Sequence, residues 1–203
     1  MNFRKTKGVN GSFCIDQCIY LLALLFFLKA IFLAFWITPL WDIPDETGHF
    51  AYTRNIGSLQ GFPLLGEAEI EPDILSHVYG KPVKTGVKNW IAMHPPVFYI
   101  LTGIVWKIGT FFTDSAEMLY RIPRVVSAFF GAATLIVIYR LLLLLNVRPV
   151  SSLGIVACLS FIPMYSHLSS GTQHDTTVTF FTALAVFFWS RYLLDKKNKD
   201  AYM

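Results

Sequence analysis

Residues 19–52 read IYLLALLFFLKAIFLAFWITPL followed by WDIPDETGHFAY. The first part is apolar apart from Lys29, and it is long enough to cross a bilayer core of about 30 Å. The second part places three carboxylates and a histidine directly after the apolar run: Asp42, Asp45, Glu46 and His49. The stretch therefore predicts a membrane-spanning helix that ends near Leu40 and leaves an acidic cluster just outside the bilayer.

A short helix is expected to follow, over residues 45–59. Pro44 favours the first turn of a helix, and Asp42 is a candidate N-cap. Residues at i, i+4 and i+7 share one helix face, which here groups an acid, an imidazole and a phenol: Asp45, His49 and Tyr52. The same acids would also complement the helix dipole as a simple cap, and the residues alone leave both interpretations open.

The composition of the chain indicates a polytopic membrane protein. Of its 203 residues, 54% are hydrophobic and 16% aromatic, which is more apolar than a soluble domain. The expected fold class is all-α, with about four transmembrane helices and an outer-face loop that carries juxtamembrane helices. The predicted segments are a cytoplasmic tail over 1–18, a transmembrane module over 19–194 with spans 19–40, 125–145, 151–168 and 176–194 and an outer loop 41–121, and a second cytoplasmic tail over 195–203.

The placement of basic residues favours four spans over five. Basic clusters flank both ends of the module, and such clusters mark the cytoplasmic side: Arg4, Lys5, Lys7, Lys196, Lys197 and Lys199. The apolar segment 95–112 is short and interrupted by Lys107, so it either crosses the membrane or lies in its interface. Only the interfacial placement leaves both termini inside. No basic stretch lies outside these flanks, which excludes nucleic acid as a partner.

Several single residues have structural explanations. Cys14, Cys18 and Cys158 form neither a metal motif nor a disulfide set. The first span is expected to be an uncleaved anchor, because no small-residue cleavage site follows it. Lys29 in the middle of this span must face protein or water, or have a partner. Pro163 is expected to bend the third span.

Four motifs in order resemble the GT-C glycosyltransferases. They are Pro-Asp-Glu-Thr-Gly-His-Phe-Ala-Tyr at 44–52, Met-His-Pro-Pro-Val-Phe-Tyr at 93–99, Arg-Ile-Pro-Arg-Val-Val-Ser at 121–127 and Gly-Thr-Gln-His-Asp at 171–175. The nearest branch is that of the protein O-mannosyltransferases and lipid A aminoarabinose transferases, which are polytopic enzymes that use polyprenyl-phosphate sugars. Members of this family usually carry more spans, so this chain is expected to be a fragment, a split subunit or a degenerate copy.

The resemblance implies a role for each matching position. Asp45 would be the catalytic carboxylate that activates the acceptor, and Asp175 would be the second catalytic acid at the outer face. The substrate-binding residues would be Glu46, His49, His94, Arg121 and Arg124, of which the last three could reach the donor phosphate. Simpler roles stay open, because His94 could be a turn residue, the arginines interface anchors and Asp175 a helix cap. His77 and His167 are interpreted as structural.

The chemistry of such a transfer agrees with these residue types. A polyprenyl-phosphate donor expels a phosphate, which cations or hydrogen-bond donors stabilise. An acceptor hydroxyl needs a general base, and a positioned aspartate can serve. One base suffices for a single displacement that inverts the anomeric carbon. The resemblance implies no obligate metal or other cofactor, although Asp45, Glu46 and His49 together remain an alternative site for a divalent cation.

The sequence thus predicts a glycosyltransferase, or its N-terminal part, that is integral to the cytoplasmic membrane and acts at the outer face. The expected partners are the polyprenyl-phosphate sugar donor, membrane lipid, and a second subunit or further C-terminal helices. Two alternatives belong to other classes. One is a non-catalytic subunit or truncated copy that binds lipid phosphate or a partner, and the other is a transporter fragment in which Lys29 and Asp175 would face a water-filled path.

Overall fold

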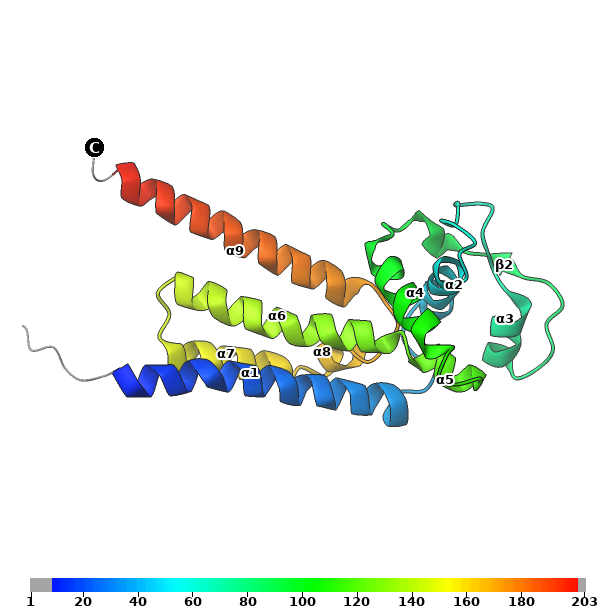
Figure 1. The fold of residues 1–203 in the computed structure, drawn as a ribbon, viewed down its shortest axis with the longest axis horizontal. Coiled ribbons are helices and arrows are strands. Elements are labelled where there is room, and N and C mark those ends of the chain that lie inside the picture. Colours follow the sequence, from blue (N-terminus) through cyan, green and yellow to red (C-terminus); the bar gives the residue numbers. More distant parts are fainter. Residues whose placement is uncertain (1–8, 201–203) are drawn as a thin grey trace, which may run out of the picture.

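The computed structural model describes residues 9–200 and the side chains of residues 16–196. The basic cluster of Arg4, Lys5 and Lys7 lies outside the described residues, as do the side chains of Cys14, Lys197 and Lys199. The described chain consists of a long helical bundle with a layer of shorter elements at one end (Figure 1). This confirms the prediction of an all-α polytopic fold.

Four helical rods form the bundle. The first is α1 (Val9–Phe32), which ends in a π-helical turn, η1 (Leu33–Ile37). The others are α6 (Arg124–Leu144), the pair α7 (Pro149–Ser160) and α8 (Pro163–Leu168), and α9 (Asp175–Asp200). In Figure 1, α1 begins and α9 ends at the end of the bundle that is remote from the layer.

Within the described residues, three helical segments are long and apolar enough to cross a membrane: Asp16–Ile37, Ala116–Leu144 and Asp175–Lys196. The predicted third span, 151–168, is two shorter helices, because Pro163 begins α8 and cannot continue the hydrogen bonding of α7. The expected bend is therefore a break. The four-span topology and its sidedness stay predictions.

The core of the bundle joins three of these rods. Ile19 and Phe26 from α1 pack with Leu135 and Tyr139 from α6 and with Val156 from α7. The break between α7 and α8 leaves carbonyl groups without helical partners, and a lysine of α1 compensates for one of them.

Lys29 meets the expectation that it has a partner within the protein. Its Nζ donates to the carbonyl oxygen of Ser160 at 2.5 Å, at the end of α7. The ammonium group also lies over the ring of Phe26, 4.8 Å from the ring centroid. A cation at this depth is thereby compensated by a helix-end carbonyl and an aromatic face.

The layer at the end of the bundle contains all the remaining elements. Its helices are α2 (Glu46–Gly57), α3 (Pro72–Tyr79), α4 (Val97–Gly109) and α5 (Ala116–Arg121), with a 3-10 turn, η2 (Trp90–Met93). Two short antiparallel strands, β1 (Glu69–Ile70) and β2 (Val87–Lys88), pair Glu69 with Lys88. The sequence did not predict this small sheet.

Helices α2 and α4 are held in close contact. A Cβ atom on Gly57 would lie 2.8 Å from the carbonyl oxygen of Gly103, so only glycine allows this approach. Next to this contact, the buried hydroxyls of Thr53 and Thr102 are hydrogen-bonded at 2.8 Å. Helix α4 corresponds to the ambiguous segment 95–112, and it lies in the layer rather than among the four rods (Figure 1).

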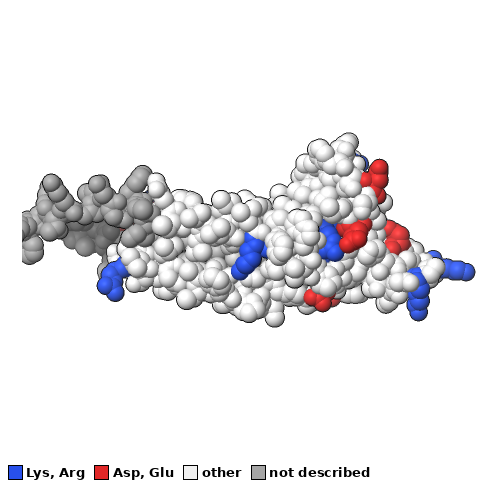
Figure 2. Space-filling view, turned by 90° about the horizontal axis from the view of Figure 1, so that it is seen from below, with Lys and Arg blue, Asp and Glu red and all other residues white. Residues whose placement is uncertain are grey.

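The charged side chains are distributed unevenly between the bundle and the layer. On the face drawn in Figure 2 they are sparse along the bundle and gather toward the end that carries the layer. A bundle of low surface charge with a polar layer at one end is the distribution expected for a protein that is embedded in lipid and carries its chemistry at the membrane surface.

Candidate active site

A buried ion pair lies where the bundle meets the layer. The Nε and Nη2 atoms of Arg124 donate to the two carboxylate oxygens of Glu46, each at 2.8 Å. The side chains are 0% and 1% exposed. The carboxylate also accepts the backbone N–H groups of Trp41 and Thr172, both at 2.8 Å. Such complete hydrogen bonding is what makes a buried charge pair tolerable.

Arginine side chains also close the end of the first bundle helix. The π-helical turn leaves the carbonyl groups of Ala34 and Thr38 free, and both accept from Nη1 of Arg124 and from Nη1 of Arg121 at 2.8–3.1 Å. The remaining N–H of Arg124, on Nη2, donates to the carbonyl oxygen of Pro39. Cationic donors at a helix C-terminus complement the partial negative charge there.

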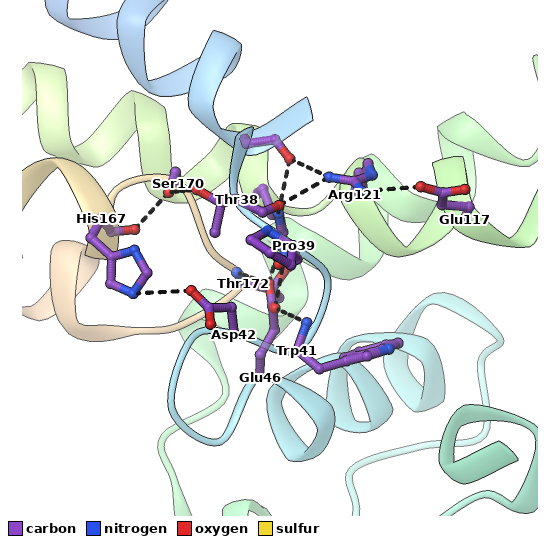
Figure 3. Close-up of polar contacts among 12 residues, drawn as sticks. Thr38, Pro39, Trp41, Asp42, Glu46, Glu117, Arg121, His167, Ser170 and Thr172 are labelled. Atoms are coloured by element: carbon purple, nitrogen blue, oxygen red, sulfur yellow. Dashed lines mark hydrogen bonds and ion pairs between the residues drawn. The ribbon is translucent and has the colours of Figure 1, made fainter. Parts of the chain in front are cut away.

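The loop before α2 is fastened to the loop before α9 (Figure 3). The hydroxyls of Thr38 and Ser170 are 2.9 Å apart, and Nε2 of His167 is 3.8 Å from a carboxylate oxygen of Asp42. Between these contacts, Gly171 packs so closely on Ile43 that a Cβ atom would overlap it. Two loops that are distant in the sequence therefore act as one unit.

This fastening creates a small cavity at the end of the bundle. It has a volume of about 160 Å³, and Asp45, His49, His94, His174 and Asp175 line it together with apolar residues. Three elements supply the polar groups, namely α2 with its N-cap, the end of η2 and the start of α9. The cavity thus gathers carboxylates and imidazoles that the sequence separates widely.

Asp45 occupies an unusual position in this cavity. It is the N-cap of α2, with φ 60° and ψ 10°, a left-handed conformation that aspartate tolerates better than most residues. Its side chain makes no cap hydrogen bond. Instead, one carboxylate oxygen accepts from the indole Nε1 of Trp90 at 3.2 Å. The exposed carboxylate is therefore oriented by an indole, and it does not cap the helix.

Three histidine rings meet at the cavity. His94 Nδ1 and His174 Nε2 are 3.1 Å apart. The ring centroid of His49 lies 5.2 Å from that of His174 and 5.8 Å from that of His94. The Nδ1 atom of His49 is hydrogen-bonded to the hydroxyl of Tyr99 at 2.7 Å, and Tyr99 stacks on Tyr52 with centroids 3.8 Å apart.

Burial lowers the pKa of two of these rings. It is the largest cause that lowers the pKa of His49 to about 3, and the neighbouring His174 and His94 contribute to the same shift. Burial also lowers the pKa of His174, with a smaller contribution from His94 and an opposing one from Asp175. The pKa of the Tyr99 hydroxyl is raised by burial. His49 and His174 therefore offer neutral donors and acceptors at neutral pH, beside two carboxylates.

Asp175 begins α9 and carries its side chain at the cavity mouth. Its backbone N–H donates to the side-chain oxygen of Gln173 at 2.7 Å, and the hydroxyl of Ser127 donates to the backbone carbonyl of Gln173 at 3.1 Å. The carboxylate of Asp175 is exposed and lies 3.7 Å from Nε2 of His174. The start of α9 is thus fixed on α6, and its acid remains free to face the cavity.

The predicted site residues divide into two groups. The structure brings together Asp45, His49, His94 and Asp175 around one cavity. The other three, Glu46, Arg121 and Arg124, lie in the buried junction, where their polar atoms already bond protein groups. His77 and His167, which were interpreted as structural, contact Trp41 and Asp42 respectively.

Sequence reasoning missed three residues of the site. Trp90 orients Asp45, Tyr99 bonds His49, and His174 belongs to the histidine cluster. Only His174 carried a usable signal, because it precedes the predicted acid Asp175 directly. Trp90 and Tyr99 carried no such signal, because their partners depend on the packing of η2 and α4 on α2.

The alternative of a cation held by Asp45, Glu46 and His49 is not supported. Glu46 turns into the buried pair, away from the cavity that the other two line. Within residues 16–196, no group of three or more histidine, cysteine or acidic side chains is arranged to hold a metal ion.

Comparison with known proteins identifies one matching family. Residues 87–201, more than half of the chain, match the family model described as dolichyl-phosphate-mannose-protein mannosyltransferase. The matched part contains His94, Arg121, Arg124 and Asp175, and Asp45 lies before it. No curated protein and no solved structure matches the chain.

Proposed function

The chain belongs to the dolichyl-phosphate-mannose-protein mannosyltransferases, a family of membrane glycosyltransferases, and we propose that it transfers a sugar from a polyprenyl-phosphate donor to an acceptor hydroxyl at the outer face of the cytoplasmic membrane. The single observation that carries this proposal is that Asp45 and Asp175 line one cavity with His94. A donor anchored in the membrane would present its sugar at this end of the bundle.

In the proposed reaction Asp45 is the general base. Its carboxylate takes the proton of the acceptor hydroxyl while the acceptor oxygen bonds the anomeric carbon. The bond from that carbon to the phosphate oxygen breaks, and the lipid phosphate leaves with the electron pair. A single displacement of this kind inverts the anomeric centre. The indole of Trp90 holds the base in position, and a positioned base contributes a rate factor of about 10²–10⁴.

The histidines and the second acid complete the assignment. We assign His94 and His174, whose ring nitrogens are 3.1 Å apart, the role of donating hydrogen bonds to the leaving phosphate and so stabilising its developing charge. Asp175 is the second outer-face acid, and its place beside His174 suits it to orient that ring. We assign Glu46 and Arg124 a positioning role, because their pair fixes the loop that carries Asp45. Arg121 supports the same junction through the end of α1.

One observation favours a second candidate, a non-catalytic subunit or truncated copy that binds a partner chain. Among the residues that the structure describes, no arginine or lysine lines the cavity. Hydrogen bonds from histidines would therefore be the main stabilisation of a phosphate's negative charge, and two carboxylates would lie close to it. This arrangement would suit weak binding, or a site to which another chain contributes a cation.

A transfer assay separates the two candidates. The full chain in lipid nanodiscs is given radiolabelled mannosyl-phosphoryl polyprenol and a serine- and threonine-rich peptide. Asp45→Asn should lower transfer by about 10²-fold or more, with an unchanged melting temperature because the side chain is exposed. The matched control is Asp114→Asn, which removes an exposed carboxylate of the layer that does not line the cavity. Full transfer by Asp45→Asn would refute its role as base, and no transfer by the unaltered chain would favour the non-catalytic candidate.

A further inference from the structure

An apolar groove lies along the seam between α1 and α6, away from the candidate active site. It has a volume of about 320 Å³. Tyr20, Leu24 and Phe27 line it from α1, and Phe129, Ala133 and Ile136 line it from α6. Leu24 and Phe129 are 52% and 57% exposed, so the groove is accessible from outside the bundle. We call it the α1–α6 groove.

The groove is expected to face hydrocarbon. Both of its walls belong to segments that are long and apolar enough to cross a membrane. From Phe129 to Arg140, α6 rises roughly 16 Å at 1.5 Å per residue, which is close to half of a bilayer core of about 30 Å. The groove therefore extends from the end of the bundle that is remote from the layer to about the middle of the membrane, as an acyl chain of that leaflet does.

The remote end of the groove carries a basic residue. Arg140 follows Ile136 by one helical turn, and residues four apart lie on the same face of a helix. Its Nη2 atom donates to the hydroxyl of Tyr20 at 2.7 Å, and its guanidinium carbon lies 5.8 Å from the centroid of the Tyr20 ring. Helix α6 ends one turn later, at Leu144. The guanidinium thus lies close to the level at which lipid headgroups would meet the bundle.

The charge of Arg140 is not balanced by a carboxylate of the described chain. Other arginines do form ion pairs with acids, namely Arg54, Arg121, Arg124 and Arg191. On the facing helix, the carboxylate of Asp16 accepts from the hydroxyl of Tyr139 at 2.7 Å. Within residues 16–196, the phenol oxygen of Tyr20 is the one hydrogen-bond partner of Arg140. Because a guanidinium presents five N–H donors in a planar fork that matches phosphate, most of its donors remain for an anion from outside the chain.

We propose that the α1–α6 groove binds an anionic phospholipid, with the phosphate at Arg140 and Tyr20 and one acyl chain along Leu24 and Phe129. The apolar walls suit a hydrocarbon chain, whose burial is favourable in proportion to the area covered. The unbalanced guanidinium selects a lipid of net negative charge over a zwitterionic one. This site lies at the opposite end of the bundle from Asp45, so the inference does not rest on the proposed transfer.

Photolabelling of the full chain in phosphatidylcholine nanodiscs tests the groove directly. The probe is a trace of phosphatidylglycerol with a photoreactive group on one acyl chain. We expect labelled peptides from α1 and α6, strong competition by unlabelled phosphatidylglycerol, and little competition by further phosphatidylcholine or by inorganic phosphate. Labelling spread evenly over all the rods, or equal competition by phosphatidylcholine, would overturn the proposal. Equal competition by inorganic phosphate would indicate a site for a free anion and would overturn it as well.

Two arginines provide a matched pair of variants for the headgroup. Arg140→Gln should lower the preference for phosphatidylglycerol over phosphatidylcholine about fivefold, which corresponds to about 1 kcal/mol. The control is Arg148→Gln, which removes an exposed arginine that also has no ion pair among the described residues but lies in the turn before α7, outside the groove. The control should keep the full preference. Equal losses in the two variants would show a general effect of surface charge and would contradict the assignment.

Two alanines provide a second pair for the acyl chain. Ala133→Phe fills the groove, whereas Ala157→Phe makes the same change at a partly buried alanine of α7 that does not line it. Ala133→Phe should lower the labelling of α1 and α6 about tenfold, and Ala157→Phe should leave it unchanged. Equal labelling of the two variants would refute the groove as the lipid site.

Milder variants keep the test decisive if these substitutions prevent folding. Tyr20→Phe keeps a ring that is 50% exposed and removes the hydroxyl that holds Arg140, so the preference for phosphatidylglycerol should fall about threefold. Ala133→Val narrows the groove and should lower labelling by a similar factor. Unchanged preference in the first variant together with unchanged labelling in the second would overturn the proposal.

Discussion

Arg124 and Glu46 form a fully buried pair in which the guanidinium uses all five of its N–H groups. Two go to the carboxylate and three to carbonyls at the end of the first bundle helix. Because Glu46 directly follows Asp45, this pair determines where the proposed base lies. The buried pair thus connects the end of a membrane helix to the chemistry of the layer.

Replacing Glu46 should destabilise the protein strongly. In Glu46→Gln the buried guanidinium loses its counter-charge, and removing one partner of a buried pair costs about 3–5 kcal/mol. The matched control is Glu117→Gln, which alters an ion pair to Arg121 whose acid is 61% exposed and should cost at most about 1 kcal/mol. Denaturant unfolding in detergent measures both. Similar losses in the two variants would show that the buried pair does not stabilise the junction.

Trp90→Phe should lower transfer without unfolding the chain. The substitution keeps an aromatic ring on a residue that is 47% exposed and removes the N–H that bonds Asp45. A hydrogen bond to a charged group at an accessible site contributes about 1.5 kcal/mol, so we expect a loss of up to about tenfold in kcat. The melting temperature should stay within a degree or two of the original. An unchanged kcat would show that the indole does not position the base.

The stability of the chain should fall on acidification, and His49 should account for part of the fall. The pKa of His49 is lowered from 6.5 to about 3 in the folded protein. Between these values the unfolded chain binds a proton that the folded chain does not, so stability decreases as the pH drops. The slope from one such group reaches about 1.4 kcal/mol per pH unit. Unfolding from pH 7 to pH 5 should show a smaller decrease in His49→Gln, and an identical decrease would refute this origin.

Cysteine labelling should place the layer outside the cell and the α6–α7 turn inside. In a background without Cys14, Cys18 and Cys158, Lys81→Cys probes the turn after α3 and Arg148→Cys the turn before α7. Both positions are exposed. A membrane-impermeant maleimide should label the first in intact cells and the second only after permeabilisation. Labelling of both from outside would contradict the four-span topology.

Apolar runs and the prolines, glycines and polar breaks between them made much of the fold predictable. The apolar run over 125–145 and the polar break before Asp175 predicted α6 and the start of α9 to within a residue. Pro163 marked the break between α7 and α8, and Gly80 ends α3 in the left-handed conformation expected for a turn. Such features follow from local backbone chemistry, which a sequence displays directly.

The candidate site was predictable only in part, because its geometry depends on contacts between distant segments. Asp42 was expected to cap the helix, but Asp45 occupies that position since α2 begins at Glu46. The resemblance implied that Arg121 and Arg124 could reach the donor phosphate, yet both arginines turn toward carbonyls at a π-helical turn. No local sequence pattern predicts that turn. No local pattern predicts the close contact of Gly171 with Ile43 that joins the two loops either.

The most direct test of the account is a double-mutant cycle between Asp45 and Asp175, with transfer rate as the readout. Rates are measured for Asp45→Asn, Asp175→Asn and the double variant, each checked for an unchanged melting temperature. If both acids serve one reaction in one cavity, their effects are coupled, and the double variant should be no slower than the slower single variant. If the two losses multiply, the acids act independently, and the claim of a single shared site is contradicted.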